Sequence, residues 1–513
     1  MKEPACADGR QRHKASIALL FFALNFLGVL AAVLGVFVNN TWNWWIWNAD
    51  ALGQFTIASD LTSGGRLGSW NLGNATYLFP DLVFAFASNV FLPSVQGVVV
   101  SNIIFQLIFL TLAVLAYGKA TLHPHPFVLT TLAVSGLLAL AATVGEPFAL
   151  LLASAHHGSS FAAGILLLAI VLRQHNSRKT HLLLLAVTVV LFAMSDDLFT
   201  ISYAIPVACL ASMLPKALVE NRSQQVLVIL GSAMTGRLIG TALPGDLNSL
   251  PRQISLSSIK ENGVEIVDVV LFAESRTMAL GIAVLGFTAC SFYISAKFLN
   301  RRRDALPAGN AFPLVFMMAL SAVTTIVPLL LGLGSPVAER YLLQIFFIPV
   351  IVLAAVLARV ATTTQLLPVA GLIGSSFFFT AGIERGDAGP WHPWNTALSC
   401  VTDELDQSQS NQVITQYWDT HVLTLLDEGS RVFAQFLSSG EEYVNVTSID
   451  WYSPDGWYDA AILSSYAGPA HTFSPDQFVT KSGSSISSVV CGPWTILTAG
   501  TDSLGFAAFH LKS

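Results

Sequence analysis

Residues 16–38, SIALLFFALNFLGVLAAVLGVFV, contain no charged side chain and are long enough to cross a bilayer as one helix. Lys2, Arg10, Arg12 and Lys14 precede this run, and the aromatic sequence TWNWWIW (41–47) follows it. A secretory signal has a hydrophobic segment of only about 7–15 residues and a small-residue cleavage site. We therefore interpret residues 16–38 as an uncleaved signal-anchor helix that ends in an interfacial tryptophan belt.

The composition of the whole chain agrees with membrane insertion. Of 513 residues, 53% are hydrophobic and 11% are charged, whereas soluble domains carry about 25% charged residues. This excludes a disordered chain, a nucleic-acid-binding surface and an ordinary cytosolic enzyme. The formal net charge of −6 is modest for this length and indicates little about partners.

Later apolar runs predict further transmembrane helices at 96–117, 126–144, 158–172, 180–195, 198–214, 225–243, 277–298, 311–332, 341–359 and 366–381. Together with residues 16–38 they form a polytopic bundle of about eleven helices. We therefore expect a mainly α-helical membrane body over residues 1–385, with a large first outer loop at 39–95.

Basic residues indicate the orientation of these helices, because short loops rich in Lys and Arg stay in the cytoplasm. With a cytoplasmic N-terminus, the inner loops contain Lys119, Arg173, Arg178, Lys179, Lys216, Arg222, Lys297, Arg301, Arg302, Arg303 and Arg359. The short outer loops have almost no Lys or Arg near their helix ends. An odd number of helices then places the C-terminal domain outside a cytoplasmic (inner) membrane, whereas an even number would place it in the cytoplasm.

Acidic residues and histidines collect on the predicted outer side. They come from the first outer loop and from several helix ends: Asp50, Asp60, Asp81, Glu146, His156, His157, Asp196, Asp197 and Glu339, with Arg340 beside the last. Ionisable side chains at membrane level are costly and commonly functional. We therefore expect the chemistry on the outer face, with substrate bound by Glu146, His156, His157, Asp196 and Asp197.

Several of these residues also have a structural interpretation that the sequence leaves open. Asp50 is of a type that caps helices, and so are Asp196 and Asp197 at the start of the sixth apolar run. His156 and His157 are also typical of polar residues at a membrane interface. Arg237 lies roughly 10 Å below the outer end of its helix at 1.5 Å per residue. It either snorkels from a lipid-facing position or lines an outward cavity, where it would bind a phosphate or carboxylate.

The first outer loop resembles that of a known family. Asp50 follows the first helix, residues 51–61 predict an amphipathic loop helix, and FPDL (79–82) leads back into apolar sequence. Near the end of the body stands ERYLLQIFFIP (339–349). Across residues 1–381 these features resemble the GT-C superfamily of membrane glycosyltransferases. The common family form is an acidic pair such as Asp-Glu, whereas Ala51 follows Asp50 here, so the second acid is open between Asp60 and Asp81.

The resemblance implies transfer of a sugar, with inversion, from a polyprenyl-phosphate-linked donor to an acceptor on the outer face. It implies Asp50 as the base, and Arg237 or Arg340 at the donor phosphate. His156, Asp196 or Asp197 would hold sugar hydroxyls or a divalent metal, although no ligand spacing specifies a metal and no cofactor is certain. The expected partners are the donor, a glycan, lipid or protein acceptor, and membrane lipids, but no nucleic acid.

Residues 386–513 are polar and predict an α/β or α+β domain large enough for its own core. The segment 397–428 reads as a helix broken near its middle, and five shorter apolar runs at 431–437, 443–449, 458–466, 471–480 and 489–497 read as strands. Tyr417, Trp418, Trp451, Tyr452, Trp457 and Tyr458 would stack on sugars or fill the core. Cys400 and Cys491 would form a disulfide in an oxidising compartment.

Two other classes of function compete with a glycosyltransferase of cell-envelope polysaccharide biosynthesis. A transporter or flippase of a lipid-linked or polyanionic substrate would need ionisable residues at the midplane and internal repeats, and the sequence has few of the former and no evident repeat. A polymerase or ligase for surface polysaccharides would share the lipid-linked substrates, but we would not expect it to depend on an acid in the first loop.

Overall fold

The computed structural model describes residues 49–72, 75–92, 94–144, 147–155, 157–173, 177–214, 219, 221–243, 256–272, 278–300, 311–331, 339–360, 392–427, 431–443, 446–464, 473–500 and 502–507. The predicted helices at 16–38 and 366–381 lie outside these ranges. The chain divides into two compact units, which we call the helical unit (Met1–Val36, Ile103–Gly240 and Leu250–Glu384) and the mixed unit (Phe37–Asn102, Thr241–Ser249 and Arg385–Ser513).

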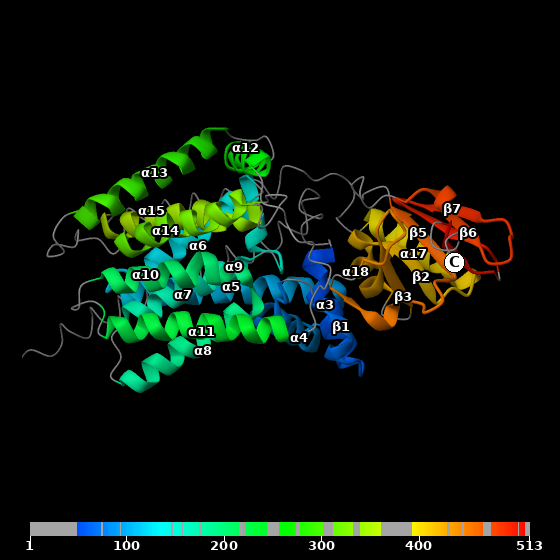
Figure 1. The fold of residues 1–513 in the computed structure, drawn as a ribbon, viewed down its shortest axis with the longest axis horizontal. Coiled ribbons are helices and arrows are strands. Elements are labelled where there is room, and N and C mark those ends of the chain that lie inside the picture. Colours follow the sequence, from blue (N-terminus) through cyan, green and yellow to red (C-terminus); the bar gives the residue numbers. More distant parts are fainter. Residues whose placement is uncertain are drawn as a thin grey trace, which may run out of the picture. The chain divides into compact units, whose positions relative to one another are not determined.

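The helical unit consists of helices whose bounds follow the apolar runs closely (Figure 1). They are α5 (Val95–Ala120), α6 (Pro126–Val144), η4 (Phe148–Leu151), α7 (Gly158–Leu172), α8 (Arg178–Ser195), α9 (Asp197–Phe199), η5 (Thr200–Ala204), α10 (Ile205–Met213), α11 (Arg222–Ala242), α12 (Leu256–Phe272), α13 (Met278–Asn300), α14 (Phe312–Leu330), η7 (Glu339–Tyr341) and α15 (Leu343–Val360). Helix α5 belongs to this unit from Ile103 onward. The run predicted as one helix at 198–214 is thus α9, the π-helical η5 and α10 in succession.

Four of the described helices are long and apolar enough to cross a membrane: Gly97–Ala120, Arg178–Ser195, Arg222–Ala242 and Phe312–Leu330. Shorter apolar helices accompany them at Leu78–Phe91, Pro126–Ala141, Gly158–Leu172, Asp197–Met213, Ile282–Ser295 and Leu343–Arg359. Large apolar side chains also remain exposed, for example Leu227, Met234 and Leu238 on α11. An apolar outer surface of this kind suits lipid rather than water, so the helices indicate a multi-pass membrane protein.

Helix α11 packs very closely on α8 because of two glycines spaced four residues apart. A Cβ atom at Gly236 would lie 2.6 Å from the carbonyl oxygen of Val190, and one at Gly240 would lie 2.6 Å from that of Met194. Small residues at this spacing let helix backbones approach in membranes, where packing rather than the hydrophobic effect holds helices together. This contact fixes Arg237, which lies between the glycines, against the end of α8.

Helix α12 was not predicted, because its sequence alternates polar and apolar residues instead of forming a continuous apolar run. Asn262, Ile266 and Val270 are buried at four-residue spacing, whereas Val264 and Val267 are exposed. The Asn262 side-chain amide donates a hydrogen bond to the carbonyl of Leu330, 3.3 Å away. The helix therefore uses one face to pack on the end of α14, as the 3.6-residue period of a helix allows.

The mixed unit joins the first outer loop to the C-terminal segment. The loop forms α3 (Ala49–Thr62), η2 (Leu67–Ser69), β1 (Trp70–Asn71), η3 (Leu78–Leu82) and α4 (Val83–Phe91). Strand β1 pairs antiparallel with β4 (Thr447–Ser448), and α3 packs against α18 (Tyr417–Leu426). The predicted loop helix is confirmed, but it is not amphipathic: residues 51–58 are buried on every side, because η3 and α4 cover it as well as α18.

The C-terminal segment contains a five-stranded sheet of order β3-β2-β5-β8-β7 (Figure 1). Its elements are α17 (His392–Gln407), β2 (Gln412–Gln416), α18, β3 (Val432–Phe436), η8 (Ile449–Trp451), β5 (Ala460–Ser464), η10 (Pro475–Gln477), β6 (Phe478–Thr480), β7 (Ser487–Cys491), β8 (Trp494–Thr498) and β9 (Leu504–Phe506). Strands β3, β2 and β5 are parallel, whereas β8 and β7 are antiparallel to their neighbours. The predicted broken helix at 397–428 is wrong in its middle, where QVITQ forms the strand β2.

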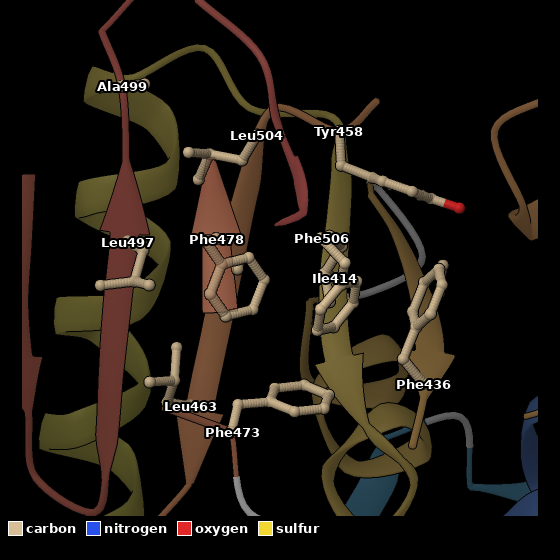
Figure 2. Close-up of a cluster of buried hydrophobic side chains, with 12 residues drawn as sticks. Ile414, Phe436, Tyr458, Leu463, Phe473, Phe478, Leu497, Ala499, Leu504 and Phe506 are labelled. Carbon is tan, nitrogen blue, oxygen red and sulfur yellow. The ribbon is translucent and has the colours of Figure 1, made fainter. Parts of the chain in front are cut away.

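Both faces of this sheet are covered. On one face, Val413, Phe433 and Ile462 pack with residues of α17 and α18. On the other, Ile414, Leu463 and Leu497 pack with Phe478 and Phe506 of the two-stranded β6–β9 ribbon (Figure 2). Successive strand residues such as Val413 and Ile414 enter opposite layers, which is the two-residue period of a strand buried on both sides.

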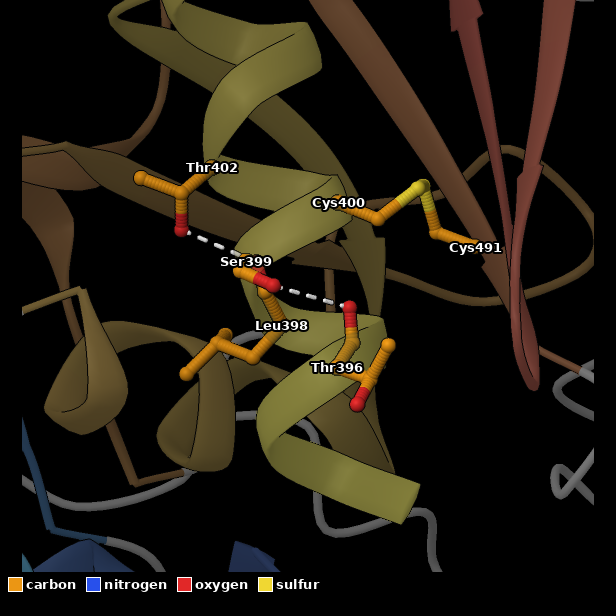
Figure 3. Close-up of a disulfide and its surroundings, with 6 residues drawn as sticks. All are labelled: Thr396, Leu398, Ser399, Cys400, Thr402 and Cys491. Atoms are coloured by element: carbon orange, nitrogen blue, oxygen red, sulfur yellow. Dashed lines mark hydrogen bonds between the residues drawn. A yellow bond between two sulfur atoms is a disulfide. The ribbon is translucent and has the colours of Figure 1, made fainter. Parts of the chain in front are cut away.

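The predicted disulfide is confirmed. Cys400 of α17 and Cys491 at the end of β7 are bonded, with their Cα atoms 5.5 Å apart (Figure 3). The bond ties α17 to the edge strand of the sheet. Because disulfides persist in oxidising compartments, it agrees with an extracytoplasmic location of this domain.

Candidate functional site

The helical unit brings together His157 and Asp196, two of the residues expected to bind substrate. His157 Nδ1 lies 2.8 Å from Asp196 Oδ2, and the hydroxyl of Ser160 donates to the same oxygen. The backbone N–H of Leu198 donates to Asp196 Oδ1 at 2.9 Å. Asp196 is therefore the N-terminal cap of α9, as the structural interpretation held, and it holds a histidine as well.

This cluster is buried and has a defined chemistry. The exposed fractions of His157 and Asp196 are 5% and 2%. A carboxylate accepts hydrogen bonds, so Nδ1 carries the proton facing Asp196, and the carboxylate fixes both the tautomer and the ring orientation. The arrangement differs from a serine nucleophile with its base, because Ser160 donates to the aspartate rather than to the imidazole.

The short helix η7 adds Arg340 and Tyr341 to this cluster. The Tyr341 ring lies 5.7 Å from the ring of His157, and the Arg340 guanidinium lies 5.4 Å from the centre of the Tyr341 ring. Arg340 was expected at the donor phosphate, and the structure places it one aromatic ring away from His157. Tyr341 was not predicted, although it stands within the quoted ERYLL sequence.

The other predicted arginine, Arg237, has a carboxylate partner. Its guanidinium forms an ion pair with Asp197 at the start of α9, and the two side chains are 29% and 48% exposed. Asp197 therefore neutralises much of the positive charge that was expected to bind an anion. The pairing gives the guanidinium an acidic partner, and both alternatives for Arg237 stay predictions.

In the mixed unit, Asp50 in the first turn of α3 accepts a hydrogen bond from the hydroxyl of Tyr417, the first residue of α18. Nearly two turns further along α3 and one turn further along α18, His421 Nδ1 lies 3.2 Å from the hydroxyl of Thr56. Complete burial lowers the pKa of His421 to about 4, against the smaller raising effects of the Asp50 charge and the Val446 backbone. His421 is therefore neutral at pH 7.

The two alternative acids of the first loop are placed differently. Asp60 Oδ2 accepts a hydrogen bond from the indole of Trp70 at 2.7 Å, which ties the end of α3 to β1. Asp81 lies in η3 and is buried. Asp50 has the same intermediate exposure as Asp60, and it differs in accepting a hydrogen bond from the C-terminal segment, at Tyr417.

A further buried carboxylate, Asp419, was missed because it stands in the segment interpreted as a broken helix. It lies in the first turn of α18, where Oδ1 accepts a hydrogen bond from the Trp494 indole at 3.0 Å. Burial raises its pKa to about 6, although hydrogen bonds from Trp494 and Ser464 oppose this effect. Val413, Ile414 and Thr415 are three successive β-branched residues, which favour a strand, and they were the signal that could have indicated β2 and hence this position.

The structure describes only some of the predicted residues. Glu146, His156 and the side chain of Glu339 lie outside the described residues. Within the described ranges, no three His, Cys, Asp or Glu side chains converge in a way that could hold a metal ion. The metal expectation for His156, Asp196 or Asp197 thus stays a prediction.

Comparison of the sequence with models of known protein families finds no match, and no curated protein sequence is significantly similar to it.

Proposed function

We propose that the protein is an integral membrane glycosyltransferase of the GT-C type. It transfers a sugar, with inversion, from a polyprenyl-phosphate donor to a hydroxyl acceptor at the outer face of the cytoplasmic membrane. The observation that carries the proposal is the partly buried carboxylate of Asp50, held at the start of α3 by the Tyr417 hydroxyl. In this proposal about eleven helices span the membrane.

Asp50 acts as the base in this reaction. The acceptor oxygen attacks the anomeric carbon, its proton passes to the Asp50 carboxylate, and the bond to the polyprenyl phosphate breaks. A carboxylate is suited to this task when it is ionised, oriented and reachable. The hydrogen bond from Tyr417 favours the ionised carboxylate and orients it, and the partial exposure of Asp50 makes it reachable.

Charge that develops on the leaving phosphate requires a positively polarised partner. Arg340, which lies near the Tyr341 ring that also contacts His157, is our first candidate for this role in the helical unit. Arg237 is the second, since its ion pair with Asp197 already uses part of its hydrogen-bonding capacity. The Cys400–Cys491 disulfide supports the outer location of the C-terminal domain.

Release of polyprenyl phosphate from a synthetic donor tests the proposal. Full-length protein in lipid nanodiscs is incubated with polyprenyl-phosphate-linked sugars and a panel of glycan, lipid and peptide acceptors, and the released phosphate is quantified by mass spectrometry. We expect Asp50→Asn to lower the rate by roughly 10²–10⁴-fold, the range for removing a general base. Asp60→Asn is the matched control, because Asp60 binds Trp70 and should influence stability more than rate. Wild-type turnover by Asp50→Asn would exclude Asp50 as the base.

A transporter of a lipid-linked substrate remains the second candidate, because the helical unit contains a buried polar network. The hydroxyls of Ser202 and Thr325 lie 2.6 Å apart, and the Gln344 amide donates to Thr325 at 2.9 Å. Ser202 belongs to the π-helical η5, and such irregular turns are frequent at functional sites. Flipping of a fluorescent polyprenyl-phosphate lipid in proteoliposomes, without sugar transfer, would favour this candidate.

A further inference from the structure

Asp50 and Tyr417 are separated by 367 positions in the sequence, and they meet because α3 packs on α18. Tyr417 directly follows β2, so it stands at the carboxyl edge of the parallel strands β3, β2 and β5. In open α/β sheets this edge is where ligands commonly bind. Asp50, the acid of the first outer loop, is thus held at the carboxyl edge of the C-terminal sheet, which is the edge where ligands commonly bind.

The packing of α3 on the C-terminal segment fixes the position of Asp50 relative to Tyr417. Gly53, one turn after Asp50, faces Val446 so closely that a Cβ atom would lie 2.6 Å from Val446 Cγ1. Thr56 meets His421 a turn further on. Beyond the helix, β1 pairs with β4. Three separate contacts therefore prevent α3 from sliding or rotating relative to Tyr417.

The ring of Tyr417 is itself immobilised. It is 3% exposed and makes edge-on contacts with Trp418 and Tyr443, with ring centres 4.8 and 5.0 Å away. A phenol with a fixed ring can direct its hydroxyl at only a narrow range of positions. The carboxylate of Asp50 occupies one of them.

Resting on the proposed function, we propose that Tyr417 is the positioning residue for the base Asp50, so that the C-terminal domain completes the catalytic site. The hydroxyl donates to Asp50 Oδ1, which orients the carboxylate and favours its ionised form. The domain is then required for turnover itself and not only for binding an acceptor.

Within the part of the chain that the structure describes, the titratable groups on the helices packed against α3 are Tyr417, Asp419 and His421 of α18 and Asp81 of η3. Replacing the Tyr417 hydroxyl leaves the other three in place. A change in the pH dependence of kcat in the Tyr417 variants therefore reports on the hydrogen bond to Asp50 rather than on a lost charge.

The test compares pH–rate profiles of full-length wild type, Tyr417→Phe and Tyr452→Phe with the same synthetic donor. We expect Tyr417→Phe to lower kcat by roughly 10–100-fold, in keeping with the sensitivity of rate to small misplacement of a reacting group. The donor KM should stay unchanged, and the acidic limb of the kcat profile should move to higher pH. Tyr452→Phe is the matched control, since the Tyr452 hydroxyl donates to the backbone carbonyls of Gln435 and Tyr443. The acidic limb of the kcat profile of Tyr452→Phe should not move.

A second variant covers the case in which Tyr417→Phe does not fold. Incorporation of 3-fluorotyrosine at position 417 keeps the shape of the ring and makes its hydroxyl a stronger donor. The acidic limb should then move to lower pH, opposite to the effect of phenylalanine. If neither variant moves the limb while Asp50→Asn is inactive, Tyr417 does not position the base, and only this inference fails. If Asp50→Asn is active, both this inference and the proposed function fail.

Discussion

His157 and Asp196 come from the start of α7 and the end of α8, and their side chains meet with Nδ1 and Oδ2 2.8 Å apart. The His157 backbone is in the left-handed region, with φ of 65°. This conformation is uncommon for a non-glycine residue and is found disproportionately at functional sites. The two loops that carry these ionisable groups on the predicted outer side are therefore joined by a specific buried contact, and not by proximity alone.

Asp196→Asn should destabilise the protein and impair turnover. The carboxylate accepts from His157, Ser160 and Leu198, and a neutral amide cannot reproduce all three bonds. We expect a loss of about 1–3 kcal/mol in the free energy of unfolding, the usual cost of leaving buried polar groups unsatisfied. Thermal unfolding and sugar transfer are measured on the same preparations. Ser160→Ala removes one of the three donors and should cost less; an equal or larger loss would contradict the central role of Asp196.

Arg237→Gln should weaken donor binding, whereas Asp197→Asn should not. The pair is partly exposed, so breaking it should change the free energy of unfolding by no more than about 1 kcal/mol. If Arg237 contacts the donor phosphate, Arg237→Gln raises the donor KM. Asp197→Asn frees the guanidinium and should lower the donor KM or leave it unchanged. An increase in both variants would indicate that the ion pair itself, rather than the arginine, serves binding.

Removal of the Cys400–Cys491 disulfide should destabilise the mixed unit. The two cysteines are 91 positions apart, and cross-linking a loop of this size restricts the unfolded chain by an amount typically worth 2–4 kcal/mol, so we expect a loss of about that size. Guanidinium unfolding, followed by tryptophan fluorescence with and without reductant, measures it. The variant Cys400→Ser/Cys491→Ser should match the reduced wild type. Equal stability of reduced and oxidised protein would be inconsistent with a structural role for this bond.

The stability of the mixed unit should depend on pH through His421 and Asp419, with opposite signs. The pKa of His421 is lowered from 6.5 to about 4, so its contribution is present above pH 6.5 and is lost as the pH falls toward 4. The pKa of Asp419 is raised from 3.8 to about 6, so burying it costs stability increasingly as the pH rises from 4 to 6. Each effect is worth roughly 3 kcal/mol at most.

Asp419→Asn separates these two effects. The amide oxygen can still accept from the Trp494 indole, and no charge is buried. The variant should therefore be more stable than wild type at pH 8 by up to about 3 kcal/mol. It should also lose stability more steeply between pH 6 and pH 4, because the contribution of His421 is no longer offset. Denaturant unfolding at pH 4, 5, 6 and 8 measures the difference, and parallel curves for the two proteins would refute this account.

The fold was predictable where one continuous segment of the chain carries the hydrophobic pattern of its own helix. The apolar runs at 126–144 and 158–172 coincide with α6 and α7, because a lipid-exposed helix satisfies its backbone hydrogen bonds within the run. Helix α12 and strand β2 were missed for the same physical reason. Each is stabilised by the surface it packs on, and a short mixed pattern such as QVITQ does not by itself distinguish a strand from part of a helix.

The sequence by itself determined that this is a membrane protein with a polar C-terminal domain, and it singled out Asp50, His157 and Asp196 from very few charged residues. Scarcity of charge made those residues conspicuous, because an ionisable group in an apolar chain is costly. Only the tertiary structure decided their partners: Tyr417 for Asp50, and the shared oxygen of Asp196 for His157 and Ser160. Side-chain hydrogen bonds act over about 3 Å, and which groups come that close depends on how helices pack, not on their order along the chain.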